Sequence, residues 1–436
     1  MKVILCPDSY KNNISSVELC EIMKEAILDV KPETKVLSVP IADGGEGTLD
    51  SISLALSSQK EHFGNFEGDS KNNEKSKIEG LNCDASDDDK TSDESLSDIS
   101  NEDKKSNESL SDIEKSKAKY KLISASVAGP FLEPIRAKYL FNGTCAIIES
   151  AKVIGISLVG ENRNVKKTSS YGLGQLIKHA LSNGAKTIIL ALGGSSTNDL
   201  GVGMASALGY KFLDKDNRRF IPTAQTLGKV AAFDYSDANK DIFNTTFITM
   251  VDCNNPLIGK DGATYVYAKQ KGASDEDLPF LESNMCHIAT ILSKTYGKDF
   301  VTMKGAGAAG GLGAATKIFL GAKLQSGIDT LLNLISFDKM LENTDLVITG
   351  EGRFDYQSLM GKAISGIAKR AKNEGVKVIV IAGQADVENY DDFKDKGIDA
   401  AYSINESDMP KEEKIKRSRE DVYLTTKKAF ENFLNK

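Results

Sequence analysis

Four short polar loops contain the residues whose types and spacing suit chemistry on an anionic ligand. Each follows an apolar run, and they read PDSYK from Pro7, DGGEG from Asp43, GGSSTND from Gly193 and TGEGRFD from Thr349. Together they supply glycines, hydroxyl groups, carboxylates and two cations. In an open α/β sheet such loops gather at the carboxyl ends of the strands, where ligands bind. The sequence therefore predicts one ligand site built from loops that lie far apart along the chain.

The first and last loops contain the two cations, Lys11 and Arg353. A lysine holds a carboxylate or phosphate as a point charge, whereas an arginine can grip such a planar group with two hydrogen bonds. Asp8 and Ser9 stand just before Lys11 and belong to the same predicted site. An ordinary turn explains PDSYK equally well, and a surface pair between Arg353 and Asp355 would contribute little to stability.

The DGGEG loop places two carboxylates, Asp43 and Glu46, around two glycines ahead of a predicted helix. Oxygen ligands suit Mg²⁺, and glycines let the backbone approach a ligand closely. A glycine turn with Asp43 as a helix cap is the simpler alternative. Two acids in so tight a loop favour a metal site.

The GGSSTND loop offers backbone N–H groups, three hydroxyls, an amide and a carboxylate ahead of a second predicted helix. Helix N-termini bind phosphate through their free N–H groups and the helix dipole. A capping role would need only one of these hydroxyls, which favours a functional loop. Asp199, the last residue of the loop, could orient or deprotonate a substrate hydroxyl.

A glycine- and alanine-rich segment, Lys304–Lys317, contains a G-x-G-x-x-G pattern at Gly305–Gly310. The preceding KDFVTM is a poor strand, and no acidic residue stands about 20 positions on, as a dinucleotide site requires. A nicotinamide site, a loop that approaches a phosphate and tight helix packing all remain open. No Walker-A motif occurs in the chain, so a nucleotide would not be held by a P-loop.

The elements that must position these loops alternate between strand and helix. Apolar runs such as Lys2–Cys6 and Thr187–Leu192 are followed by segments with helical spacing, as in Ser15–Val30, where Ser15 and Glu18 have capping-box spacing. The same order recurs near the C-terminus. This alternation predicts an α/β fold with a mainly parallel sheet.

One segment, residues 67–119, differs in composition from the rest of the 436 residues. It has no aromatic residue, and its 16 acidic and 9 basic residues account for the whole net charge of −7. Such a stretch cannot bury enough apolar surface to offset its ordering entropy, so we expect a disordered insertion. A tolerated surface loop is favoured over a regulatory arm. The neutral remainder has no basic footprint for nucleic acid.

Composition excludes several other classes of site. The six cysteines form no CxxC pair, which argues against structural zinc and disulfides, and the three histidines lie outside the glycine loops, which argues against a Ser-His-Asp centre. No apolar run approaches the roughly 20 residues that span a bilayer, and the N-terminal apolar stretch is too short for a signal peptide. We expect a cytoplasmic protein with no membrane partner.

Taken together and in order, these motifs resemble the type-1 glycerate kinase family, over nearly the whole chain except residues 67–119. The resemblance rests on PDSYK, LSVPIADGGEGT, VAGPFLEPIRAKY, IIESA, YGLGQLI, GGSSTND, VDCNNPLIGKDGATYVYAKQKGA, GAGAAGGLGA and DLVITGEGRFDYQSLMGK. Ser196, Leu173 and Gln175 depart mildly from the family pattern. Leu200 stands where the family has glycine, which matters if that backbone position requires a positive φ.

The resemblance implies two α/β domains with the active site in the cleft between them. One domain is expected to be Rossmann-like and built from residues 1–60 plus 290–436, and the second, residues 120–289, is inserted in it. It also implies a phosphotransferase that uses ATP and Mg²⁺ to phosphorylate D-glycerate, most often at the 2-hydroxyl to give 2-phosphoglycerate. The alternatives are an NAD-dependent oxidoreductase of small hydroxy acids and a non-catalytic glycerate or nucleotide sensor.

Residue roles follow from the loop chemistry and the resemblance together. The predicted catalytic residues are Asp199, with Asp43 as its rival for the base, and the cations Lys11 and Arg353. The predicted substrate-binding residues are Asp8, Ser9, Asn198, Asp252 and Lys362. The predicted nucleotide-phosphate contacts are Gly193, Gly194, Ser195, Ser196, Thr197, Gly305, Gly307, Gly310 and Gly311. The predicted Mg²⁺ ligands are Asp43, Glu46 and Glu351.

Overall fold

The computed structural model describes most of the chain in three dimensions. The described residues are 1–10, 13–42, 44–63, 119–355, 358, 363–385, 391–405 and 410–435. Three predicted site residues, Lys11, Asp43 and Lys362, lie outside them, as does the expected disordered insertion apart from Lys119.

A five-stranded parallel sheet brings the two ends of the chain together. Its strands run in the order β16 (Ala400–Ser403), β14 (Lys377–Ala382), β12 (Leu346–Gly350), β1 (Lys2–Pro7) and β2 (Lys35–Ser38). The N-terminal strand pairs with β12, which lies more than 300 residues later, with Val3 opposite Leu346. The strands β1 and β12 are buried along their whole length, as expected when helices cover both faces of a parallel sheet.

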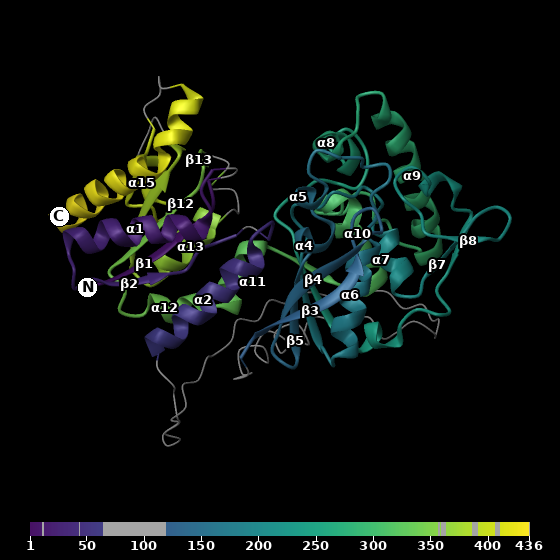
Figure 1. Ribbon diagram of the computed structural model, residues 1–436, viewed down its shortest axis with the longest axis horizontal. Helices are drawn as coiled ribbons and strands as arrows, with labels where there is room; N and C mark the ends of the chain where they lie inside the picture. The colour runs from purple at the N-terminus through teal and green to yellow at the C-terminus, as the bar shows by residue number, and fades with distance from the viewer. Residues whose placement is uncertain are drawn as a thin grey trace, which may run out of the picture.

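Helices cover the two faces of this sheet (Figure 1). One face is covered by α1 (Ser16–Val30) and α15 (Lys411–Leu434), which pack against each other and share an apolar cluster with the strands. The predicted start of α1 is confirmed, since the N–H of Glu18 donates to Ser15 Oγ at 3.2 Å. The other face carries α11 (Gly327–Leu334), α12 (Phe337–Leu341) and α13 (Ala363–Asn373). Two short strands, β13 (Arg353–Phe354) and β15 (Gln384–Ala385), and the one-turn helix α14 (Asp391–Lys394) complete this part.

A six-stranded mixed sheet is formed by the middle of the chain. Its strands run in the order β11 (Lys323–Gln325), β10 (Thr246–Met250), β6 (Thr187–Ala191), β5 (Cys145–Glu149), β4 (Pro134–Phe141) and β3 (Lys121–Ala128). The first four are mutually parallel, and β4 and β3 are antiparallel additions. Both sheets are mainly parallel, so the predicted α/β fold is confirmed.

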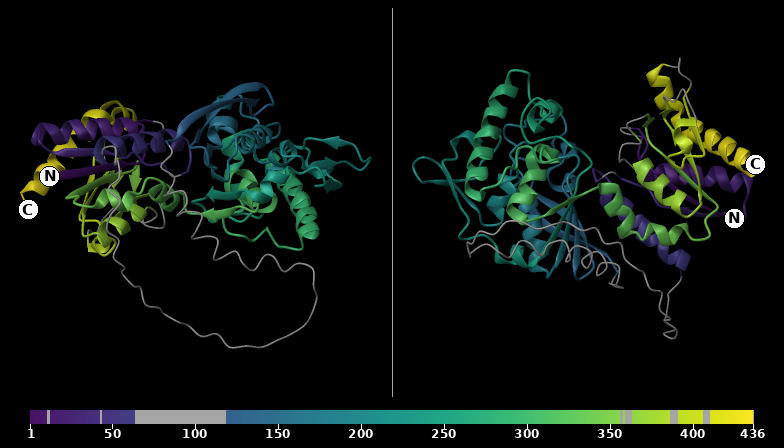
Figure 2. Two further views of the ribbon diagram at one scale, coloured as in Figure 1. Left: turned by 90° about the horizontal axis from the view of Figure 1, so that it is seen from below. Right: turned by 180° about the vertical axis from the view of Figure 1, so that it is seen from behind.

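The remaining helices and strands surround this second sheet. The helices are α4 (Ala151–Ile154), α5 (Ile156–Val159), α6 (Tyr171–Ser182), α7 (Val202–Ala207), α8 (Ala263–Tyr267), α9 (Asp277–Tyr296) and α10 (Ala308–Leu320), with 3₁₀ turns η1 (Leu227–Lys229), η2 (Lys240–Asn244) and η3 (Lys269–Lys271). A small sheet of β7 (Lys211–Leu213), β8 (Arg219–Phe220) and β9 (Ala232–Asp234) lies at the end farthest from the termini (Figure 2). None of the helices within the described residues combines the length and apolar composition needed to cross a membrane.

Two helices join the sheets. α2 (Thr48–Phe63) and α11 lie between them (Figure 1), and one apolar cluster contains Ile4 of β1, Leu49 of α2, Ile189 of β6 and Leu331 of α11. The position of the domain boundary near residue 290 stays a prediction. The pairing of β11 with β10 favours a boundary after Gln325, because residues up to that point belong to the six-stranded sheet.

Candidate active site

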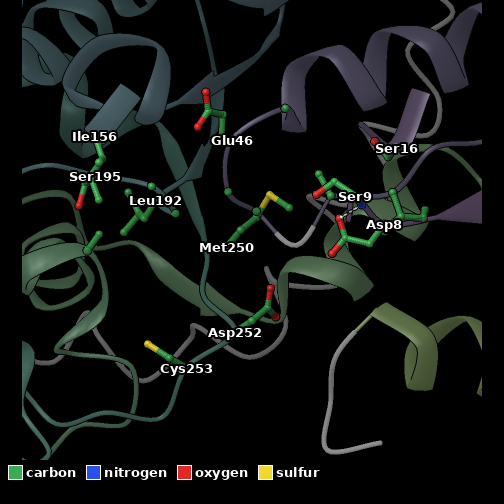
Figure 3. A pocket seen from close by; sticks show the side chains of 18 of the residues that line it. Asp8, Ser9, Ser16, Glu46, Ile156, Leu192, Ser195, Met250, Asp252 and Cys253 are labelled. Carbon is green, nitrogen blue, oxygen red and sulfur yellow. Dashed lines mark hydrogen bonds between the residues drawn. The ribbon is translucent and has the colours of Figure 1, made fainter. Parts of the chain in front are cut away.

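A cavity of about 880 Å³ lies between the two sheets. Its walls include the loops that follow β1, β2, β6 and β10, so both halves of the fold contribute (Figure 3). These loops leave the carboxyl ends of parallel strands, the position expected for ligands in α/β sheets. The predicted site residues on the cavity wall are Asp8, Ser9, Glu46, Gly193, Gly194, Ser195 and Asp252.

The DGGEG and GGSSTND loops interlock through their glycines. The N–H of Gly193 donates to the carbonyl oxygen of Gly44 at 2.9 Å. A Cβ atom on Gly193 would lie 2.4 Å from the Cα of Gly45, closer than atoms can approach. Glycine is therefore required at this position by the close approach of two backbones, and the two loops form one surface.

A buried carboxylate that the sequence analysis did not single out, Glu149, fixes the start of α2. It ends β5, and its two oxygens accept hydrogen bonds from the N–H groups of Gly47 at 3.1 Å and Leu49 at 2.9 Å. Burial raises the pKa of Glu149, and these hydrogen bonds and nearby Lys152 oppose that shift. Glu149 thus ties the DGGEG loop of one sheet to a strand of the other. The feature of the sequence that could have identified Glu149 is a charged residue at the end of an otherwise apolar strand.

Asp252 connects the cavity to the second joining helix. Its Oδ1 accepts a hydrogen bond from the N–H of Gly327, the first residue of α11, at 2.8 Å. A carboxylate at a helix N-terminus is stabilised by the free N–H groups and the helix dipole. In Figure 3 the carboxylates of Asp8 and Asp252 both turn toward the space between the two halves, whereas Glu46 lies apart from them, near Gly194.

Asp199 is fully buried and does not line the cavity. One oxygen accepts from the backbone N–H and the hydroxyl of Ser170, both at 2.8 Å, and the other accepts from the N–H of Gly201 at 3.1 Å. Burial raises the pKa of Asp199 and the hydrogen bonds oppose it. Its predicted role as a base stays untested, and this geometry favours a positioning role for the loop.

Three further residues of the GGSSTND loop are also buried rather than part of the cavity wall. The hydroxyl of Ser196 donates to the carbonyl of Ile154 at 2.9 Å, and the side-chain amide of Asn198 donates to Thr264 Oγ1 at 3.2 Å. Thr197 is fully buried between them. They hold the loop in place, so only its first three residues face the cavity.

The glycine-rich segment packs against this loop instead of following a strand. A Cβ on Gly310 would lie 2.0 Å from the carbonyl oxygen of Thr197, and Gly310 and Gly311 both have positive φ. Of the predicted contacts, Gly305, Gly307, Gly310 and Gly311 are absent from the cavity wall, which this segment reaches through Ala308 and Ala309. The segment therefore matches the tight-packing alternative and lacks the strand–turn–helix context of a dinucleotide site.

Leu200, which stands where the family has glycine, does have a positive φ. Its φ is 48°, and its N–H donates to the carbonyl of Gly310 at 3.2 Å. Such a conformation costs a non-glycine residue of order 1 kcal/mol or more. Leu200 is fully buried in the core of the six-stranded sheet, and this burial offsets the strain.

The TGEGRFD loop follows β12 beside the end of β1, with Gly350 opposite Pro7. Glu351 therefore lies at the same sheet edge as Asp8, since neighbouring strands are about 4.8 Å apart. Arg353 has a side chain 65% exposed, and its Nε lies 3.7 Å from Asp355 Oδ2. Neither Glu351 nor Arg353 belongs to the cavity wall.

Two cations on the cavity wall were missed by the sequence analysis. Burial lowers the pKa of Lys152, but its 3.0 Å pairing with Asp50 and the charges of Glu149, Asp50 and Glu46 outweigh burial, so the pKa is raised and the charge is retained. Lys271 is 2% exposed, and its Nζ donates to the carbonyl of Thr197 at 2.7 Å and to Ser195 Oγ at 3.2 Å. Lys271 was inside a quoted motif, YAKQKGA, but only the fold shows that it reaches the cavity.

The family model described as glycerate kinase family matches residues 3–81 and 110–434. The chain belongs to the glycerate kinase family. The internal gap in this match, residues 82–109, falls within the acidic segment 67–119. As a member of this family the chain is an enzyme, a phosphotransferase with an alcohol group as acceptor.

Named relatives of this glycerate kinase family member cover nearly its whole length. A glycerate kinase of Bacillus cereus is 35% identical over 430 residues, which is 98% of this chain and 96% of the relative. A glycerate 2-kinase of Escherichia coli is 32% identical over 93% of this chain and 90% of its own. The crystal structure of a protein assigned as glycerate kinase 2 from Salmonella typhimurium LT2 aligns with a TM-score of 0.72 and 29% identity, over 100% of this chain and 98% of that one.

Proposed function

We propose that this protein transfers the γ-phosphoryl group of ATP to the 2-hydroxyl of D-glycerate, in the cavity between the two sheets. The hydroxyl oxygen forms a bond to the γ-phosphorus, the bond from that phosphorus to the bridging oxygen breaks, and ADP, 2-phosphoglycerate and a proton are released. Phosphoryl transfer depends mainly on positioning and charge stabilisation.

The observation that carries the proposal is the mixture of groups on one cavity wall. Carboxylates, two lysines, a serine hydroxyl and a glycine-rich turn surround the same space. A nucleotide and a small hydroxy acid are both anionic, and cations and backbone N–H groups suit their phosphate and carboxylate groups. Because the cavity wall includes loops from both sheets, the two reactants would bind next to each other between the two halves of the molecule.

The carboxylates on the wall fit a magnesium ion in their chemistry. Among the described residues no three His, Cys, Asp or Glu side chains form a ready-made metal cluster. Kinase Mg²⁺ needs only one or two carboxylates, with phosphate oxygens and water completing the shell. Asp8 and Asp252, which face the same space, or Glu46 on the other side of the cavity, would be available to hold it, where it would neutralise phosphate charge. Removing divalent ions with EDTA should abolish turnover, and added Mg²⁺ should restore it.

The remaining residues take roles that match their positions. Gly194 and Ser195 would contact nucleotide phosphate, while Asp199 would act through the loop that carries them. Lys11, Asp43, Glu351 and Lys362 keep their predicted roles as proposals. The predicted catalytic role of Arg353 stays untested and is not proposed, because its side chain is mostly exposed and lies off the cavity wall. The E. coli relative's name supports phosphorylation at the 2-position.

One assay tests the proposal against both alternatives. Purified full-length protein is incubated with D-glycerate and either MgATP or NAD⁺, while ADP and NADH are followed and phosphorus NMR identifies the product. ADP with 2-phosphoglycerate is the expected result. NADH formation would support an oxidoreductase, 3-phosphoglycerate would correct the position, and ligand binding without turnover would indicate a sensor.

A further inference from the structure

Lys271 reaches the cavity from the short turn η3 and is buried almost completely, with 2% exposure. Its Nζ donates to the carbonyl of Thr197 and to Ser195 Oγ. An ammonium group has three N–H donors, so these two acceptors leave one donor for a ligand. The side chain is held in one place by the same loop that would contact the nucleotide.

The charge of Lys271 has no ion-pair partner among the described residues. Burial lowers its pKa to about 7, and the nearby charge of buried Asp199 opposes that shift only in part. A buried cation without a close counter-ion is costly. An anionic ligand in the cavity would supply the missing counter-charge.

The neighbouring backbone is suited to the same kind of ligand. Gly194 has φ of 75°, and neither its N–H nor that of Ser195 donates a hydrogen bond to another described residue. N–H groups in such a turn form concave sites for anions. A lysine, a hydroxyl and two N–H groups together match the oxygen atoms of a phosphate better than a single carboxylate.

We propose that Lys271 is a phosphate-binding residue, whose ammonium group pairs with a phosphate of the nucleotide next to Gly194 and Ser195. This inference rests on the proposed use of ATP and extends it to a residue outside the predicted site. Phosphate binding favours the charged form of Lys271, so nucleotide binding near neutral pH takes up a proton.

Other charged groups around the site act on the same equilibrium. Asp199 faces Lys271 from the GGSSTND loop, and Arg163 Nη1 donates to the carbonyl of the adjoining Gln270 at 3.0 Å. The other charged residues on the cavity wall are Asp8, Glu46, Asp50, Lys152 and Asp252. Because these groups also respond to a bound nucleotide, the difference between wild type and a Lys271 variant isolates the lysine.

The test is calorimetric titration with Mg²⁺ and adenylyl imidodiphosphate, an ATP analogue that does not transfer its terminal phosphoryl group. Titrations at pH 7 and pH 8, in buffers of different ionisation enthalpy, give the number of protons taken up. With a pKa of about 7, we expect uptake of about 0.5 proton at pH 7 and about 0.9 at pH 8. Lys271→Met should lose this uptake and bind about tenfold more weakly or worse.

Lys269→Met is the matched control, since Lys269 is an exposed lysine in the same turn, paired with Asp275; it should keep both affinity and uptake. Lys271→Arg keeps a charge that does not titrate near pH 7, so it should bind without uptake. The inference is overturned if uptake by wild type at pH 8 exceeds that of Lys271→Met and Lys271→Arg by less than about 0.2 proton. Absence of wild-type turnover with D-glycerate and MgATP would instead overturn the proposed function.

Discussion

The GGSSTND and TGEGRFD loops follow strands of the same kind, yet they differ in almost every other respect. Both β6 and β12 are five-residue strands that are buried throughout. The first loop is interlocked with two glycine-rich segments and lies on the cavity wall, whereas the second has an exposed arginine and lies off that wall. A strand followed by a polar glycine loop therefore predicts a sheet edge, but not participation in a site.

The difference lies in which segments, distant in the sequence, reach each loop. Gly193 meets the backbone of Gly45, and Gly310 lies against Thr197. These contacts exist only because segments from elsewhere in the chain arrive at the loop. The site is therefore held together by contacts between segments that are distant in the sequence. Substitutions in or near the two loops test which loop depends on such contacts.

The largest effect is expected from Gly193→Ala. The new methyl group would lie 2.4 Å from the Cα of Gly45, so the DGGEG loop must move. A displacement of about 1 Å at a reacting site can cost roughly 100-fold in rate, and we expect kcat/KM to fall at least that much. Gly321→Ala, at a position with positive φ and no atom within 4 Å of the new Cβ, should cost only about 1–2 kcal/mol of stability. Equal activity in the two variants would contradict the interlocked-loop account.

Glu149→Ala should give the next largest effect, on stability. It leaves the half-buried N–H of Gly47 and the buried N–H of Leu49 without acceptors, at about 1–3 kcal/mol for a fully buried group and less for a partly exposed one. We expect the free energy of unfolding to fall by about 3 kcal/mol in denaturant titrations. The matched change Asp355→Ala in the TGEGRFD loop should cost under about 1 kcal/mol, because the paired Arg353 is mostly exposed and the N–H of Ser358, which donates to Asp355 Oδ1 at 3.3 Å, keeps the backbone carbonyl of residue 355 as an acceptor at 3.0 Å. A larger loss for Asp355→Ala would reverse the ranking of the two loops.

Asp199→Asn separates a positioning role from a chemical one. The amide nitrogen would face a donor, the N–H of Ser170 or of Gly201, which costs about 2 kcal/mol. We expect a lower melting temperature and lower kcat together, with an unchanged pH profile of kcat. A loss of kcat of about 1,000-fold at unchanged melting temperature would instead identify Asp199 as the base.

Sequence patterns predicted the fold class because strand runs and helical spacing are local properties. They predicted the loops as well, since Asp8, Glu46, Gly193 and Asp252 do reach one cavity. They could not tell that Asp199 is enclosed or that Lys271 reaches the cavity, because burial depends on contacts between residues far apart in the chain. The glycines of Gly305–Gly311 were ambiguous for the same reason.

Lys271, which holds the GGSSTND loop through Thr197 and Ser195, allows a test by pH. Burial lowers the pKa of Lys271 to about 7 from the ordinary 10.5. Between these values the unfolded chain binds more protons than the native one, so the free energy of unfolding should rise with pH. From pH 7 to 8.5 this contribution is about 1.5 kcal/mol. Wild type should therefore gain stability relative to Lys271→Met over that interval, and parallel curves would contradict the buried, titrating lysine.

Arg353→Gln is expected to have the smallest effect. Arg353 is 65% exposed, and its pairing with Asp355 at 3.7 Å contributes little in water. Stability should change by less than about 0.5 kcal/mol. Because Arg353 lies off the cavity wall, KM for D-glycerate and for MgATP should change by less than about threefold, as with Arg353→Lys. A tenfold or larger rise in either KM for Arg353→Gln, without such a rise for Arg353→Lys, would contradict this expectation. It would mean that the TGEGRFD loop contacts the bound ligands, so that both loops bind ligand as their sequences suggested.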